Sequence, residues 1–209
     1  MLVDLKVTDF LNKVAGNDPV PGGGSVAALN GAIASALAVM VAGLTIGKKG
    51  YEDTGEIMKH IQTLALTQKT GFVVDIDRDS EAYNKVFDCF KLPKSTDEEK
   101  KIRSAAIQEA TKFAALVPMQ VARNAYELMG IIADVAKMGN RNAVTDACVA
   151  MISARSAVLA ALMNVRINLG SLKDRTFVEQ LQSEADELER KACIKEKELL
   201  DAINQDLRI

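Results

Sequence analysis

The chain has 209 residues, which is within the size range of a single domain and long enough to bury a core without disulfides or metal ions. We therefore expect one domain over residues 1–209. Its 26 basic and 28 acidic side chains leave a net charge of -2, which argues against a nucleic-acid-binding surface. Hydrophobic residues make up 48% but aromatic residues only 4%, so small and aliphatic side chains must fill the core. That composition suits closely packed helices.

The three cysteines are widely spaced and odd in number, which predicts free thiols rather than a disulfide framework: Cys89, Cys148 and Cys193. The first residues, MLVDLKVTDF, lack the basic start and apolar stretch of a secretory signal. We therefore expect a cytoplasmic protein.

Hydrophobic side chains recur at helical spacing along most of the chain, and no segment shows the alternation typical of a β-strand. The sequence predicts an all-α fold, an antiparallel bundle of about six helices around one central helix rich in Ala and Gly. In chain order, the predicted helices cover residues 8–15, 26–46, 56–90, 95–138, 142–169 and 174–206.

Several helix ends carry capping signals. Thr8 and Ser25 are expected to cap the first two helices, because a hydroxyl oxygen can accept a bond from an unpaired backbone amide. The sequence STDEE at 95–99 predicts a capping box at the start of the fourth helix. Pro118 predicts a kink in that helix, and Gly139 predicts a left-handed residue at its end.

The apolar stretch at residues 26–47 is long enough to span a bilayer. However, most of its residues are Ala, Gly, Ser and Thr, which gain little on membrane insertion, and Asn30 adds a polar cost. Small residues that would let neighbouring helices approach recur along it: Gly31, Ser35, Ala38 and Ala42. We therefore expect this helix in the middle of a bundle and no membrane partner.

Three consecutive glycines, Gly22, Gly23 and Gly24, precede this helix and are followed by Ser25. A helix N-terminus attracts anions and polar carbonyls through its unpaired amides. The loop lacks the lysine of a P-loop and the spacing of a dinucleotide-binding motif, so a simple tight turn is the alternative. Three glycines together indicate that another group approaches the backbone closely, and we include all four residues in the predicted substrate site.

Two aspartates interrupt an apolar stripe that runs from Ile57 to Phe90 at spacings of three and four. Asp75 and Asp79 fall at positions where apolar side chains belong. A buried, unpaired carboxylate is costly or has a raised pKa, so the two predict either a wet cleft or a buried salt bridge. In the cleft, Asp75 would bind substrate. Asp77 and Glu81 turn to other faces and are expected to be solvated.

The fifth predicted helix has a stripe of small residues with polar ends: Asp146, Ala150, Ser153, Ala157, Ala160, Asn164 and Asn168. Such a stripe can line a groove. Alternatively, Asn164 and Asn168 hydrogen-bond a neighbouring helix, which is the commoner role of a buried amide. Asn140 supplies a further amide just before this helix. The predicted substrate-binding residues of this region are Asn140, Asp146, Asn164 and Asn168.

The sequence gives little support for a metal site or for a Ser-His-Asp hydrolase triad. The chain has one histidine and no CxxC, HExxH or EF-hand motif, so we expect no metal site. His60 lies beside the apolar stripe, which predicts a surface or boundary histidine and leaves no candidate for a Ser-His-Asp triad.

Six segments together resemble the formiminotetrahydrofolate cyclodeaminase family, which also includes methenyltetrahydrofolate cyclohydrolases. They are PGGGSVAA at 21–28, GKK at 47–49, DRDSEAY at 77–83, KLPK at 91–94, GNRNAVTDA at 139–147 and NVRINL at 164–169. The resemblance implies an all-helical homodimer and no cofactor beyond the tetrahydrofolate substrate. It also implies that Asp79 is the catalytic aspartate, since this residue matches the family's D-x-E-A-aromatic motif.

The activity implied is closure of 5-formiminotetrahydrofolate to 5,10-methenyltetrahydrofolate with release of ammonia. The alternatives are interconversion of the methenyl and 10-formyl compounds by a cyclohydrolase and, in another class, a non-enzymatic bundle that binds a partner. In the enzyme, Asp79 would transfer protons and Asp146 would accept N–H bonds from the pterin. Lys48 and Lys49 would either meet the glutamate tail or remain solvated.

Overall fold

The structure, a computed structural model, describes residues 1–207. In this range it contains six α-helices, three short 3-10 helices and no strand. The α-helices are α1 (Val7–Val14), α2 (Gly23–Gly43), α3 (Gly55–Phe90), α4 (Asp97–Met138), α5 (Val144–Leu169) and α6 (Arg175–Leu207). The predicted all-α class and the number of helices are therefore confirmed, and Cys89, Cys148 and Cys193 are free.

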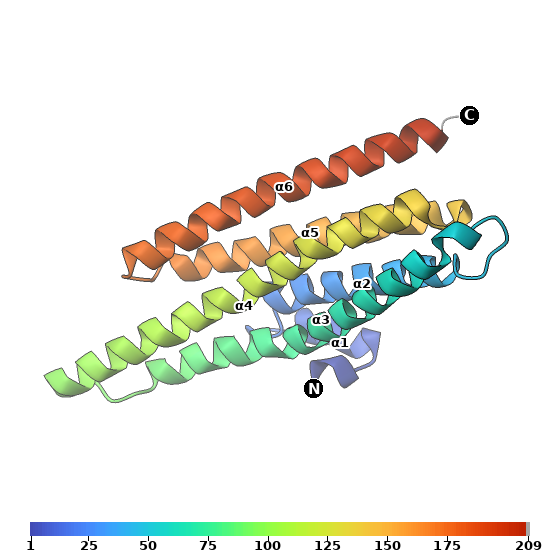
Figure 1. Cartoon of the computed structure of the whole chain (residues 1–209). Helices are drawn as coiled ribbons and strands as arrows, with labels where there is room; N and C mark the ends of the chain where they lie inside the picture. Colours follow the sequence, from blue (N-terminus) through green and yellow to red (C-terminus); the bar gives the residue numbers. More distant parts are fainter. Residues whose placement is uncertain (208–209) are drawn as a thin grey trace.

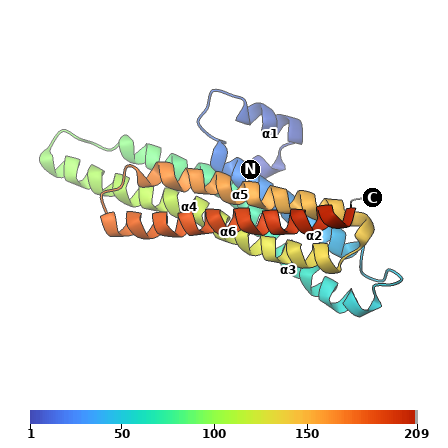
Figure 2. The ribbon, with the colours of Figure 1, turned by 90° about the horizontal axis from the view of Figure 1, so that it is seen from above.

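The long helices form an elongated bundle in which successive helices run in opposite directions (Figure 1). Helix α2 packs against α3, α4 and α5, whereas α1 lies to one side of the bundle (Figure 2). The connection between α3 and α4 projects beyond the ends of α5 and α6 in both views. The bundle thus has a projecting end and an opposite end, where α4 turns into α5.

Small residues let α2 pack closely against α3, α4 and α5, as the sequence predicts, although one of its faces is not covered by the chain. A Cβ atom at Gly31 would lie 2.7 Å from the ring of Phe72, so glycine is what allows this α3 side chain to lie against α2. By length and composition, α2 could cross a membrane, and so could the stretch Arg141–Leu169, which the sequence analysis did not identify. Buried core helices of soluble proteins meet the same criterion.

The helix starts are only partly those expected. The capping box at Thr96 is confirmed, because its Oγ1 accepts a hydrogen bond from the Glu99 amide at 3.2 Å. By contrast, Thr8 caps nothing: α1 follows Lys6, which makes no side-chain cap. Helix α2 begins after Gly22, so Ser25 lies inside the first turn and is not its cap.

The end of α4 also differs from the prediction. Helix α4 continues through Pro118 to Met138, and Gly139 then adopts an extended conformation with φ -82° rather than a left-handed one. A Cβ atom at Gly139 would lie 2.5 Å from the Val135 carbonyl oxygen. Close approach to the preceding turn, and not positive φ, is therefore the reason for glycine here.

The buried face of α3 follows a slightly different line from the predicted stripe. Ile57 and Phe90 are exposed, whereas the neighbouring Met58 and Ala82 are buried. The helix is 36 residues long, so a regular spacing of three and four drifts away from the true contact face. Asp75 nevertheless lies on the buried face and Asp79 at its edge.

Helix α6 buries few side chains completely and is joined to α4 and α5 by apolar contacts and by ion pairs. Its buried residues are Leu181, Ala185 and Ala192. The ion pairs are Arg123–Glu184, Arg155–Glu196, Arg166–Asp186 and Arg166–Glu189.

Candidate active site

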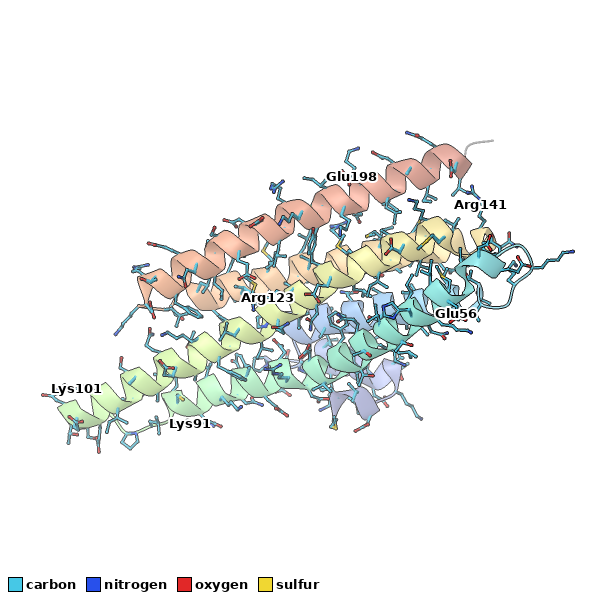
Figure 3. All side chains as sticks on the ribbon, viewed as in Figure 1. Glu56, Lys91, Lys101, Arg123, Arg141 and Glu198 are labelled. Atoms are coloured by element: carbon cyan, nitrogen blue, oxygen red, sulfur yellow. The ribbon has the colours of Figure 1, made fainter. Side chains whose placement is uncertain are left out.

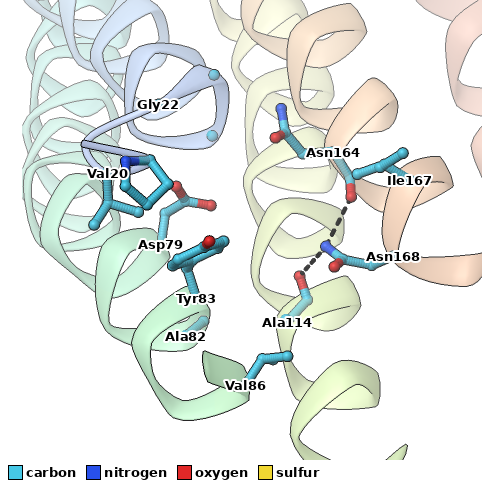
Figure 4. Close-up of a pocket in the computed structure, with 13 residues that line it drawn as sticks. Val20, Gly22, Asp79, Ala82, Tyr83, Val86, Ala114, Asn164, Ile167 and Asn168 are labelled. Atoms are coloured by element: carbon cyan, nitrogen blue, oxygen red, sulfur yellow. Dashed lines mark hydrogen bonds between the residues drawn. The ribbon is translucent and has the colours of Figure 1, made fainter. Parts of the chain in front are cut away.

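A pocket of about 310 Å³ lies where the glycine loop before α2 meets α3, α4 and α5 (Figure 4). Of the predicted site residues, six line it: Gly22, Gly23, Gly24, Asp79, Asn164 and Asn168. The structure therefore brings together the loop, the suspect aspartate and the two amides from three separate segments of the chain.

Gly24 explains how Asp79 reaches its position. A Cβ atom at Gly24 would lie 2.0 Å from Asp79 Oδ1, so any larger residue would occupy the space of the carboxyl group. The carboxyl group thus sits directly against the first turn of α2. Backbone amides are unpaired in a first helical turn and favour a negative charge beside them.

Burial is the main influence on the acidity of Asp79 and raises its pKa above the usual value. Hydrogen bonds from the side chain and backbone of Ser25 act in the opposite direction. A carboxyl group whose pKa is raised towards neutrality exchanges protons more readily at physiological pH. Asp79 is therefore suited to acid–base chemistry.

Ser25 supports Asp79 and does not itself line the pocket. It is fully buried, and its Oγ donates to the Ile76 carbonyl oxygen at 2.8 Å. The same Oγ lies 3.4 Å from Asp79 Oδ2 and 3.2 Å from Ser80 Oγ. The structure therefore favours a positioning role for Ser25 over the direct contact with substrate that we expected.

Asn168 presents an acceptor to the pocket. Its Nδ2 donates to the Ala114 carbonyl oxygen at 3.0 Å and to the Asn164 carbonyl oxygen at 2.9 Å (Figure 4). Because both N–H groups are used, Oδ1 remains available as an acceptor. Asn164 is held similarly, with Nδ2 donating to the Ala160 carbonyl oxygen at 2.8 Å. Both interpretations of these amides are therefore correct: the side chains hydrogen-bond helix backbones and also line the pocket.

The sequence left open whether Asp75 lies in a cleft or in a buried salt bridge, and the structure favours the salt bridge. It is buried, does not line the pocket, and its Oδ1 lies 3.5 Å from Arg78 Nη1. Burial raises the pKa of Asp75, and the charge of Arg78 opposes that shift. This geometry favours an ion pair over the substrate contact predicted for Asp75.

Asp77 is not on a solvated face, so that expectation was wrong. The segment before α1 covers it, and Asp77 Oδ1 accepts a hydrogen bond from the Leu2 amide at 2.7 Å. Its Oδ2 is buried and has no hydrogen-bond partner within residues 1–207. Glu81 and His60 are exposed, as expected.

The other predicted site residues lie at the opposite end of the bundle. Lys48 and Lys49 follow α2, which at 21 residues separates them from the glycine loop by about 30 Å. Asp146 is in the first turn of α5. Asn140 is buried, and its Nδ2 donates to the Leu44 carbonyl oxygen at 3.2 Å, which ties the two helix connections together. Within one chain, these four residues do not join the pocket.

Several residues that the sequence did not single out complete the pocket wall. Tyr83 lies one turn beyond Asp79 on α3, and Ile167 lies between the two asparagines on α5. Pro19 and Val20 close the side formed by the loop. Tyr83 was visible as the aromatic end of the DSEAY segment, whereas a single sequence gives no sign that Pro19 or Val20 faces the same space.

Metal binding has no visible basis in the described part of the chain. Within residues 1–207 there is no group of three or more His, Cys, Asp or Glu side chains placed to hold a metal ion. Independence from metals and cofactors remains a prediction.

Taken together, the fold and pocket define an all-helical protein with a partly buried carboxyl group beside amide side chains. The sequence profile of the family described as formiminotransferase-cyclodeaminase matches residues 6–187. The chain belongs to this family, as the resemblance implied.

Known proteins match most of the chain. A methenyltetrahydrofolate cyclohydrolase of Methylorubrum extorquens is 40% identical over 186 residues, which cover 87% of this chain and 88% of that protein. The formimidoyltransferase-cyclodeaminase of Mus musculus is 31% identical over 86% of this chain, but the match spans only 33% of that longer protein. The crystal structure of formiminotetrahydrofolate cyclodeaminase from Thermotoga maritima superposes with a TM-score of 0.85 at 32% identity, covering 97% of this chain and 99% of that one.

Proposed function

We propose that this protein closes 5-formiminotetrahydrofolate to 5,10-methenyltetrahydrofolate and releases ammonia. The observation that carries the proposal is the Asp79 carboxyl group, which lies in the pocket with a raised pKa. The fold match to the Thermotoga maritima cyclodeaminase supports the same reaction.

The reaction moves one proton between two nitrogens of the substrate. N10 attacks the carbon of the protonated formimino group, and a new C–N bond forms. The Asp79 carboxylate takes the proton from N10 and passes it to the former formimino nitrogen, whose bond to carbon then breaks. Ammonia departs with the electron pair of that bond, and the methenyl cation remains. One carboxyl group therefore serves as both base and acid.

The polar groups of the pocket suit a substrate that brings N–H donors. Asn168 has a fixed acceptor oxygen, and the Asp79 carboxylate is a second acceptor. The formimino group of the substrate carries N–H bonds at its terminal nitrogen, whereas a methenyl bridge carries none. This difference favours the cyclodeaminase reaction on chemical grounds.

A second candidate is the cyclohydrolase reaction, in which water adds to the methenyl bridge and the ring opens to 10-formyltetrahydrofolate. The observation in its favour is the 40% identity to the Methylorubrum extorquens cyclohydrolase over nearly the whole of both chains. Asp79 would then take a proton from water in place of N10.

The two reactions are separated by following the absorbance of the methenyl compound with each substrate in turn. Formation of the methenyl compound from the formimino substrate, at a rate above that of methenyl hydrolysis, supports the main proposal. Rapid loss of the methenyl compound with no reaction of the formimino substrate would support the cyclohydrolase. Activity should be unchanged by a strong chelator, since neither route calls for a metal.

A further inference from the structure

The pocket continues along α3 into a second hollow. This hollow has a volume of about 330 Å³ and shares Pro19, Val20 and Tyr83 with the pocket. Its remaining wall includes Asn84 and Phe87 from the next turn of α3. A ligand whose reacting atoms lie at Asp79 could therefore extend along α3 and stay in contact with the protein over its length.

Side chains four residues apart form an ordered row on this side of α3: Asp79, Tyr83, Phe87 and Lys91. The rings of Tyr83 and Phe87 are stacked, with centroids 6.5 Å apart and planes 11° apart. Lys91 Nζ lies 4.6 Å from the centre of the Phe87 ring. From the pocket outwards, the row presents a carboxyl group, two aromatic faces and a cation.

We propose that this row binds the p-aminobenzoylglutamate part of the folate, with the aromatic ring against Tyr83 and Phe87 and the glutamate carboxylates near Lys91. The inference rests on the proposed function. N10, which reacts at Asp79, is bonded directly to the p-aminobenzoyl ring, so that ring must lie beside the carboxyl group. The glutamate follows the ring, as the cation follows the aromatic residues along α3.

The exposure of these side chains agrees with a surface that a ligand covers. Phe87 is 52% exposed and Tyr83 41% exposed, so both rings leave apolar area that a ligand can cover. Lys91 Nζ also contacts Asp88 at 2.7 Å, but both side chains are mostly solvated. Exposed pairs of this kind contribute little, so a ligand carboxylate can replace Asp88.

The sequence suggested that Lys48 and Lys49 meet the glutamate tail, whereas this proposal places the tail near Lys91. Lys91 lies at the projecting end of the bundle, far from Arg141 at the other end (Figure 3). Lys48 and Lys49 are at that other end, about 30 Å from the glycine loop along the 21 residues of α2, whereas Lys91 lies on the same row as Asp79.

The test measures binding of 5-formyltetrahydrofolate by calorimetry to the full-length protein and to two single variants. Phe87→Ala should weaken binding about threefold to tenfold through loss of ring stacking. Lys91→Ala should weaken it about twofold to fivefold, since the ionic contact is exposed. Neither change should affect binding of 6-methyltetrahydropterin, which lacks the tail, whereas a general structural defect would weaken both ligands.

Phe90→Ala is the matched control, because Phe90 is also 52% exposed on α3 but lines neither hollow. It should bind both ligands as the unaltered protein does. If the Phe87 or Lys91 variant weakened binding of both ligands equally, or of neither, the subsite would be overturned and the proposed function would remain intact. Failure of the unaltered protein to bind either ligand would overturn the proposed function together with the subsite.

Discussion

Burial raises the pKa of Asp79, and hydrogen bonds from Ser25 lower it. No cation contributes to the shift. Asp79→Asn keeps the size of the side chain but removes its capacity to transfer a proton. We expect turnover to fall roughly a hundredfold to ten-thousandfold while folate affinity is largely kept. Single-turnover measurement of methenyl formation tests this, and normal turnover per folded molecule would refute the catalytic assignment.

The same variant separates a catalytic carboxyl group from a structural ion pair. A raised pKa in the folded state means that the Asp79 charge destabilises the fold, by an amount that grows as pH rises above the pKa of the unfolded chain. Asp79→Asn should therefore be at least as stable as the unaltered protein at neutral pH, and the difference should vanish in acid. A loss of about 3 to 5 kcal/mol, as expected on breaking a buried ion pair, would contradict this. Thermal melting across pH gives the answer.

Gly24 should also be needed for activity, because it makes room for the Asp79 carboxyl group. A methyl group at this position would lie 2.0 Å from Asp79 Oδ1 and must displace the carboxyl group. We expect Gly24→Ala to lower kcat by at least tenfold, which corresponds to about 1.4 kcal/mol of transition-state stabilisation.

Gly71→Ala is the control for this substitution. Gly71 is also helical, and a Cβ atom there would meet nothing within 4 Å. The control should keep full activity and gain roughly 0.5 to 1 kcal/mol in the free energy of unfolding, because alanine restricts the unfolded chain. Equal activity of the two variants would show that the space beside Asp79 is not needed.

Helix α6 combines partial apolar burial with ion pairs. It contributes few fully buried side chains, and Arg123, Arg155 and Arg166 connect it to α4 and α5. Salt screens partly exposed ion pairs but not apolar contacts, so the two kinds of packing should respond differently. We expect amide hydrogen exchange in α6 to accelerate at about 1 M sodium chloride while α2 remains protected. Equal protection of both helices in high salt would show that apolar contacts hold α6.

The helices could be predicted from the sequence because their signals are local. Three local signals mark boundaries within a few residues of those observed: Pro93, the Thr96 capping box and Gly170. Gly139 was misjudged because a glycine can be required either by a positive φ or by a close neighbour. Sequence cannot distinguish these reasons, since the neighbour's position depends on the fold.

The candidate site was only partly predictable, for a related reason. Asp79 stood out because a carboxyl group interrupted an apolar stripe, and the glycines stood out as a run. Lys48 was grouped with them because of the GKK segment and its charge, although the length of α2 already implied that it lies at the other end of the bundle. Tyr83 was treated as part of the apolar stripe, yet it faces the pocket.

At the scale of the whole molecule, α2 leaves one apolar face uncovered. Its partly or fully exposed residues recur at helical spacing: Leu29, Ile33, Leu37, Met40 and Leu44. A second copy of the chain covering this face would account for it, as the expected homodimer requires. We expect Ile33→Glu to convert a dimer into a monomer, as judged by sedimentation velocity.

Val74→Glu provides the matched control, because Val74 is 54% exposed on α3 compared with 43% for Ile33 on α2. It should leave the dimer unchanged. A monomeric unaltered protein would contradict the expectation, and recovery of the protein mainly in the membrane fraction would instead indicate that lipid covers α2.

The pocket beside Gly24 is assembled from helix bodies and one short loop, and its groups come from distant parts of the chain. Asp79 belongs to the middle of α3 and Asn168 to the end of α5, so neither can be aligned unless the bundle is formed. The geometry needed for reaction is therefore set when the protein folds and not when substrate arrives. The fraction of active molecules should consequently report global folding: on heating, it should stay constant and then fall together with the cooperative loss of helix.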